Sequence, residues 1–182
     1  LERDFVVEDD ESRQLCDAAG GVLQQLENEI HSSAMLVVLT DPSGTIMHRG
    51  GSRDMLKLAD SIELGNGSNV AERVTGTNGC GSSLVVGDIT PVDLYEHYCE
   101  GFFEWADVGI SVVHPATNSI LGAIDLIRWK HALTPELFLL ARATALNLTA
   151  QTGSRDAIRR RPRLNALPSR PRCAGHAPTP AR

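Results

Sequence analysis

Residues 106–128 read ADVGISVVHPATNSILGAIDLIR, and this stretch determines how the sheet of the protein is built. Two apolar, β-branched runs, Ala106–His114 and Ser119–Arg128, are separated by the four residues Pro115-Ala116-Thr117-Asn118. Proline and asparagine favour turns, so the two runs predict a pair of strands joined as a hairpin. Because a hairpin connects antiparallel strands, the stretch predicts an antiparallel sheet.

A second hairpin and two long helices surround this stretch. Ala34–Thr40 is apolar and β-branched, Asp41-Pro42-Ser43-Gly44 is typical of a type I turn, and Thr45–Arg49 completes the hairpin. Apolar residues recur every three or four positions over Asp9–His31 and again from Thr134 to about Thr152, which predicts two amphipathic helices. Packed together on one face of the sheet, these helices give an α+β sandwich.

Shorter elements fill the middle of the chain. Ser52–Ser61 is periodic and predicts a short helix, while Ile89–Leu94 predicts a short edge strand that tolerates Pro91. A helix is expected to begin after Thr77 or Asn78, either of which is a natural N-cap, and to end near Gly87. Glu96–Phe103 predicts a short helix or a loop.

Charge divides the 182 residues into two parts. The formal net charge of −6 combines 9 Lys and Arg against 22 Asp and Glu over residues 1–152 with 8 Arg and one Asp over residues 153–182. The second part is rich in Arg and Pro and has almost no apolar periodicity, so it cannot offset its own ordering entropy. We therefore predict a folded domain over residues 1–152 and a disordered tail over residues 153–182.

The four cysteines, Cys16, Cys80, Cys99 and Cys173, are scattered without metal-ligand spacing. This distribution favours a reduced cytoplasmic protein and supports neither a zinc module nor a disulfide scaffold. The longest apolar runs are too short to cross a membrane, and the start of the chain does not resemble a signal peptide. We expect no membrane partner, no metal and no cofactor.

The glycine-rich segment Gly76–Ser83 has the spacing of a P-loop, but Ser82 occupies the position of the phosphate-binding lysine. Nucleotide hydrolysis is therefore not predicted. Cys80 lies at an expected helix start, which lowers its expected pKa, and His97 or His114 could serve as its base. The sequence places neither histidine beside it, so no catalytic residue is assigned and the chain is not predicted to be an enzyme.

Aromatic residues cluster in one short segment. Tyr98, Phe102 and Trp105 fall within eight positions, beside His97, in a chain that is only 4% aromatic. Two interpretations remain open: the rings close the end of the sheet, or they form the wall of an apolar cavity with a few polar contacts. Asp125 lies inside an apolar run and needs a hydrogen-bond partner if it is buried.

One ordered series of motifs resembles a known family. It consists of Glu72, GTNGCGSSL (76–84), Pro91-Val92, Glu96-His97-Tyr98-Cys99, Trp105 and LGAIDL (121–126). The series, which spans roughly residues 15–152, is similar to the GAF sensory domain of acetoin-catabolism-type, sigma-54-dependent transcriptional activators. That family usually has Trp at the position of Val70 and often Cys at the position of Val108. Its activators continue into an ATPase module and a helix-turn-helix, which residues 153–182 do not resemble.

The resemblance implies a GAF-like central antiparallel sheet of five or six strands, with the terminal helices on one face and a ligand pocket on the other. It implies the signal-input domain of a bacterial transcriptional regulator, which binds a small organic effector such as an alcohol or ketone. The expected ligand-binding residues are Thr77, Asn78, Cys80, His97, Tyr98, Phe102, Trp105, Val108 and Asp125. We expect a homodimer through a bundle of the terminal helices, and contact with DNA only through an output domain outside this sequence.

Three other functions stay open at this point. A redox or iron sensor would use Cys80 and Cys99 with His97, and a cysteine-based reductase would use Cys80 alone. A purely dimerising module would bind no small molecule.

Overall fold

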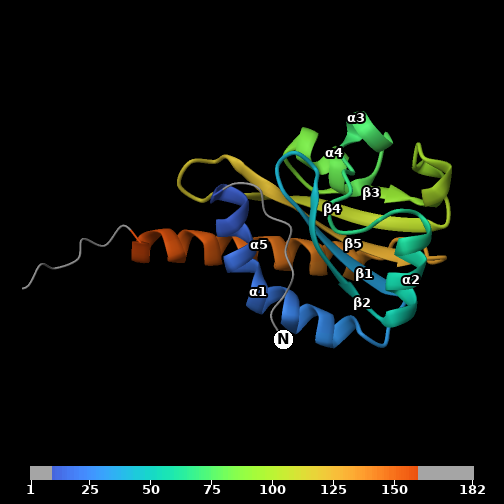
Figure 1. Ribbon diagram of the computed structural model, residues 1–182, viewed down its shortest axis with the longest axis horizontal. Coiled ribbons are helices and arrows are strands. Elements are labelled where there is room, and N and C mark those ends of the chain that lie inside the picture. Colours follow the sequence, from blue (N-terminus) through green and yellow to red (C-terminus); the bar gives the residue numbers. More distant parts are fainter. Residues whose placement is uncertain (1–9, 160–182) are drawn as a thin grey trace, which may run out of the picture.

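The computed structural model describes residues 10–159. In chain order its elements are α1 (Asp10–Ile30), β1 (Met35–Thr40), β2 (Ile46–Gly51), α2 (Arg53–Ser61), α3 (Glu72–Thr75), α4 (Gly79–Val86), β3 (Thr90–Asp93), the 3-10 turns η1 (Leu94–Glu96) and η2 (Glu100–Phe102), β4 (Trp105–Val113), β5 (Ile120–Trp129) and α5 (Pro135–Arg159). Figure 1 shows the sheet in the middle of the domain, with the long helices α1 and α5 side by side.

The five strands form one antiparallel sheet in the order β2-β1-β5-β4-β3. Both predicted hairpins are confirmed, as β1–β2 and β4–β5, and β3 is an edge strand as expected. The turn between β1 and β2 closes with a hydrogen bond of 3.1 Å from the Gly44 N–H to the Asp41 carbonyl. The first and second hairpins join through β1 and β5, so the central strands are contributed by distant parts of the chain.

Each face of the sheet packs against a different set of helices. The terminal helices α1 and α5 cover one face, where Val108, Ile110 and Val112 of β4 enter the larger apolar core. On the other face Trp105 belongs to a second core, together with side chains from α2 and α4. Successive side chains of a strand point to opposite faces, so β4 contributes to both cores. The arrangement confirms the expected α+β fold.

Helix α4 lies close against the sheet, and its ends are fixed by the sequence. The Asn78 side chain caps the N-terminus by accepting a hydrogen bond of 2.7 Å from the Gly81 N–H. Gly87 ends the helix in the left-handed conformation at φ 77°. At the start of the helix, Gly79 and Gly109 of β4 meet so closely that a Cβ at Gly109 would collide with the Gly79 carbonyl. These two glycines bring the helix terminus onto the strand.

The main difference from the predicted elements is at the end of the domain. The final helix was expected to stop near Thr152, but α5 continues to Arg159, so residues 153–159 are helical rather than disordered. Gly153 lies within this helix, at a position where a Cβ would come within 2.6 Å of the Pro115 ring. The remainder of the predicted tail, residues 160–182, lies outside the described residues.

Two smaller differences concern the middle of the chain. Glu96–Phe103 forms parts of two separate 3-10 turns, and the four-residue helix α3 was not predicted. Within residues 10–159, no helix has the combination of length and apolar character that a membrane span needs.

The contact between Gly79 and Gly109 can be tested by substitution. Gly109→Ala should lower the free energy of unfolding by at least about 2 kcal/mol, because the new methyl group overlaps the Gly79 carbonyl and backbone would have to move. The matched control is Gly20→Ala in α1, where a Cβ meets nothing within 4 Å. This control should gain about 0.5–1 kcal/mol from better helix propensity. If urea unfolding gives Gly109→Ala the same free energy of unfolding as the parent protein, the close contact is contradicted.

Candidate effector-binding cavity

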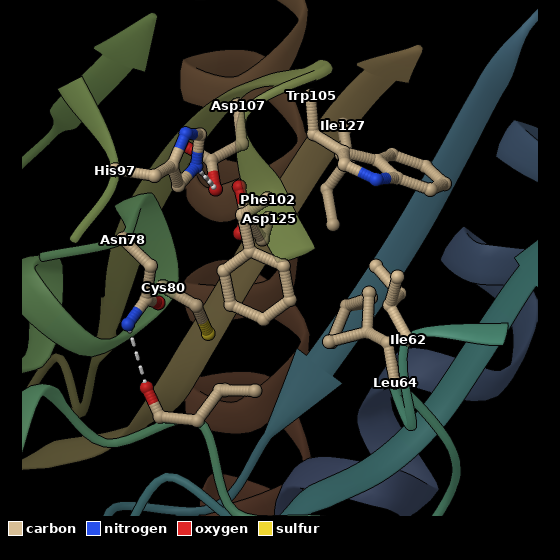
Figure 2. Close-up of a pocket in the computed structure, with 12 residues that line it drawn as sticks. Ile62, Leu64, Asn78, Cys80, His97, Phe102, Trp105, Asp107, Asp125 and Ile127 are labelled. Carbon is tan, nitrogen blue, oxygen red and sulfur yellow. Dashed lines mark hydrogen bonds and ion pairs between the residues drawn. The ribbon is translucent and has the colours of Figure 1, made fainter. Parts of the chain in front are cut away.

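A small cavity lies on the face of the sheet opposite α1 and α5, between β1, β4, β5, α4 and the 3-10 turns (Figure 2). It leaves about 20 Å³ for the centres of water-sized molecules, which is room for roughly one water. Its lining residues are Val38, Ile62, Leu64, Val70, Asn78, Cys80, His97, Phe102, Trp105, Asp107, Asp125 and Ile127. The polar side chains gather near α4 and the apolar ones form the remaining walls.

The Asn78 side chain lines the cavity, but its polar atoms are occupied by the protein. Its oxygen caps α4, and its Nδ2 donates to the carbonyls of Val70 and Gly76 at 2.9 and 2.8 Å. The Thr75 hydroxyl is a third hydrogen-bond partner of this nitrogen, at 3.0 Å. Asn78 therefore fixes the loop that leads into α4, and this structural role leaves it little capacity to bind a ligand.

Asp107, in β4, is the centre of the polar end of the cavity. Its two oxygens lie 3.1 and 3.2 Å from the Gly79 N–H at the start of α4, and Oδ2 is 3.2 Å from Nε2 of His97. It was not among the expected ligand-binding residues. Strand alternation from Trp105 could have identified it, because residues two apart on a strand share a face.

His97 is buried between the η1 turn and Asp107. Its Nδ1 lies 2.8 Å from the Leu94 carbonyl, which can only accept, so Nδ1 carries a proton. Burial alone lowers the pKa of His97, but the hydrogen bond and charge of Asp107 outweigh it and raise the pKa above its ordinary value of 6.5. When the ring is protonated it donates through Nε2 to Asp107, and it packs against Phe102 in an edge-to-face arrangement with ring centroids 5.8 Å apart.

Asp125, in β5, is 2% exposed and lies beside Asp107 at the base of the cavity (Figure 2). Burial and the charge of Asp107 raise the pKa of Asp125 well above its ordinary value, although the Cys80 N–H lowers it by donating a hydrogen bond. Within the described part of the chain, its Oδ1 has no hydrogen-bond partner. The sequence analysis predicted that a buried Asp125 needs a hydrogen-bond partner. The structure leaves Oδ1 without one among residues 10–159.

Cys80 lines the cavity as expected, but the prediction of a lowered pKa was wrong. Burial and the charge of Asp125 raise the pKa of the Cys80 thiol well above its ordinary value, while a contact of 3.5 Å with the Thr40 hydroxyl opposes this only in part. The position near the helix N-terminus does not compensate for burial among carboxylates. The thiol remains protonated and is a poor nucleophile.

Three expected ligand-binding residues lie outside the cavity. Thr77 and Tyr98 are exposed, and Tyr98 is 80% accessible to solvent. Val108 is completely buried, but on the opposite face of the sheet, in the core with α1 and α5. Its neighbours Asp107 and Gly109 point to the cavity side, so the prediction for Val108 conflicts with the alternation of β4.

Among residues 10–159, no group of three or more His, Cys, Asp and Glu side chains is arranged to hold a metal ion. Cys80 is free and buried, Cys99 is free and half-buried, and Cys16 is buried. Cys173 falls outside the described residues. The geometry of the described chain offers no ligand set for the iron sensor considered above.

A wider, open pocket adjoins the cavity and leaves about 620 Å³ for the centres of water-sized molecules. Ile62, Leu64, Val70 and Phe102 line both the cavity and this outer pocket. Phe102 lies on the short η2 turn and is buried between the two spaces. Phe102 therefore forms part of the wall that the cavity shares with the outer pocket.

Comparisons with known proteins agree on the kind of domain. The sequence profile described as "MimR, N-terminal domain" matches residues 1–149. The propane 2-monooxygenase operon transcriptional activator MimR of Mycolicibacterium goodii is 31% identical over 140 residues, covering 76% of this chain and 24% of that protein. The present chain thus spans about a quarter of the length of this relative.

Solved structures share the fold at low sequence identity. The E. coli DhaR(N)–DhaL complex contains a chain with a TM-score of 0.76 and 15% identity, over 81% of this chain and 50% of that one. A GAF domain/HD domain protein from Geobacter sulfurreducens has a TM-score of 0.53 and 10% identity, over 82% of this chain and 99% of that one. The GAF-like architecture expected from the sequence is confirmed.

Proposed function

This chain belongs to the MimR N-terminal domain family, the sensory domains of transcriptional activators, and we propose that it binds a small organic effector in the cavity beside α4. The observation that carries this proposal is a cavity with apolar walls and a buried polar end. Binding sites for small molecules typically combine an apolar lining with a few polar groups that orient the ligand. The charged groups at this end are also paired, as buried charges must be.

The class of effector follows from the walls and from the relatives. Trp105, Ile127 and Val38 offer apolar surface, and the limited space favours a molecule of a few carbon atoms that displaces Phe102 toward the outer pocket. The relative MimR is named as the activator of a propane 2-monooxygenase operon. Short-chain alcohols and ketones, the products of oxidising such hydrocarbons, are the effectors that we propose.

Signal transfer would use the strands that separate the cavity from the terminal helices. In β4, Asp107 faces the cavity while the adjacent Val108 packs in the core with α1 and α5. A ligand that shifts β4 or β5 would therefore change how α5 packs, provided that it binds the two arrangements with different affinity. We propose that α5 leads to a sigma-54-dependent output module that contacts DNA in the cytoplasm.

Cysteine-based reductase activity is disfavoured by the chemistry of Cys80. A reductase needs a thiolate, whereas burial and the charge of Asp125 raise the pKa of this thiol. The curated relative is a transcriptional activator, which also favours a domain without enzymatic activity.

A homodimer through the terminal helices is the quaternary structure that we propose. Leu139 and Leu146 of α5 are 69% and 63% exposed and are seven residues apart, so they lie on one face of the helix. Exposed Ala143 lies between them and lines a groove shared with α1. A second copy that packs on this stripe would remove large apolar side chains from water.

The dimer can be tested by light scattering at tens of micromolar. The parent should have twice the chain mass of 19.6 kDa, and the double variant Leu139→Glu/Leu146→Glu should be monomeric, because the charges would face the partner. Leu148→Glu should instead unfold the domain, because Leu148 lies in the core with the sheet. A monomeric parent, or a double variant that remains dimeric, would contradict this interface.

Effector binding can be tested with a panel of short-chain alcohols and ketones in calorimetry and thermal unfolding. A true effector at 100 times its dissociation constant should stabilise the domain by about 2.7 kcal/mol. His97→Gln should weaken binding at least tenfold, because it removes the imidazole that pairs with Asp107 at the polar end. Tyr98→Ala is the matched control, since its exposed side chain lies outside the cavity, and it should change affinity less than twofold.

Two outcomes would refute the proposed function. One is the absence of binding by every compound of the panel. The other is binding that His97→Gln leaves intact while the variant remains folded, because the ligand would then occupy another site.

A further inference from the structure

We propose that Phe102 is the residue that determines which size of effector the cavity beside α4 accepts, because its ring separates the cavity from the outer pocket. The inference rests on the proposed function, since it concerns the molecules that the same cavity admits. It concerns the length of the carbon skeleton and applies equally to alcohols and ketones.

The cavity is too small for the proposed effectors unless one of its walls moves. It leaves about 20 Å³ for the centres of water-sized molecules, which is room for roughly one water, whereas the adjoining outer pocket leaves about 620 Å³. Even acetone is several times larger than a water molecule. A bound effector therefore needs space that a wall of the cavity must provide.

The walls formed by the sheet and by α4 are held in place. Val38, Trp105 and Ile127 belong to strands that pair with their neighbours in the sheet, and the start of α4 is bonded to Asp107. The wall shared with the outer pocket differs, because empty space lies on both of its sides. Its residues are Ile62, Leu64, Val70 and Phe102.

Phe102 has the largest side chain of these four residues. It lies on the three-residue turn η2, where its N–H donates to the Cys99 carbonyl at 2.9 Å, and its ring points among the other lining side chains (Figure 2). The backbone of Val70, by contrast, is held on both sides of the residue: its N–H donates to the Gly44 carbonyl at 2.8 Å and its carbonyl accepts from Asn78 at 2.9 Å. The size of the Phe102 side chain therefore contributes most to the separation of the two spaces.

The contact between Phe102 and His97 opposes displacement of the ring. The two rings pack edge to face with their centroids 5.8 Å apart, an arrangement that stabilises aromatic pairs. A short effector needs a small displacement, whereas a long carbon skeleton has to break this contact. Each buried methylene group would otherwise strengthen binding. Affinity should therefore stop increasing with chain length once the skeleton reaches the ring.

The experiment uses two series of compounds that differ in chain length, the 2-alkanones from acetone to 2-octanone and the 2-alkanols from 2-propanol to 2-octanol. Dissociation constants for the 182-residue chain are measured by calorimetry or by NMR titration. In whichever series binds, we expect the highest affinity for a short member and at least tenfold weaker binding of the longest one, since an apolar pocket discriminates by about tenfold or more per methylene group that does not fit.

Two variants assign the size limit to Phe102. Phe102→Leu should make a longer compound the best ligand and should raise the affinity for the longest member at least tenfold over the parent, and Phe102→Ala should extend this shift. Phe103→Leu is the matched control, because it makes the same substitution at the neighbouring half-buried ring, which packs against Tyr95 and lines neither space. It should leave the order of affinities unchanged.

Three outcomes would overturn the inference and leave the proposed function standing: an affinity of the parent that rises steadily to the longest compound, a folded Phe102→Leu variant with the same best ligand as the parent, or an equal shift in Phe103→Leu. Binding of none of the compounds to the parent would refute both proposals. Phe102→Leu keeps an apolar side chain in the wall, so the comparison can be made even if Phe102→Ala does not fold.

Discussion

The carboxylate of Asp107 joins three separate parts of the chain. It belongs to β4, accepts the Gly79 N–H at the start of α4, and pairs with His97 from the segment that follows η1. Since both partners come from outside the sheet, this one side chain holds α4 and the η1–η2 segment against the strands. The cavity exists between these elements, so its shape depends on the contacts of Asp107.

The same contacts determine the electrostatics of the cavity. Asp107 raises the pKa of His97 by its hydrogen bond and charge, against the effect of burial, and burial together with Asp107 raises the pKa of Asp125. Burial among these carboxylates also keeps the thiol of Cys80 neutral. Both raised pKa values and the neutral thiol reduce the negative charge of the polar end, which favours an uncharged ligand.

The two-residue period of the strands separates the cavity from the core that holds the terminal helices. Side chains of β4 and β5 alternate between the cavity and the core that contains α1 and α5. Asp125 lies between Ile124 and Leu126, which both pack in that core. Asp125 is therefore bonded directly to two residues of the core that contains α1 and α5.

Local patterns in the sequence predicted the elements well but the cavity only in part. Turn residues and caps such as Asn78 act over a few residues, so both hairpins and α4 could be predicted. Strand alternation from Trp105 places Asp107 on the cavity face, but its pairing with His97 depends on the η1–η2 turns, which no local pattern shows. Val108 was assigned to the pocket by resemblance, although alternation from Trp105 places it on the other face. The raised pKa of Cys80 depends on burial beside Asp125, which no local pattern shows.

The pH titration of the His97 imidazole, followed by NMR in histidine-labelled protein, tests most directly whether Asp107 organises this site. The account predicts a pKa above 6.5, because pairing with Asp107 outweighs burial, and a clear decrease of this pKa in Asp107→Asn. Since the folded-state pKa is raised, the stabilisation from His97 is fully present below 6.5 and is lost as the pH rises through the folded-state value. A His97 pKa below 6.5 in the parent protein would contradict the account, because burial would then dominate and the ring would be neutral.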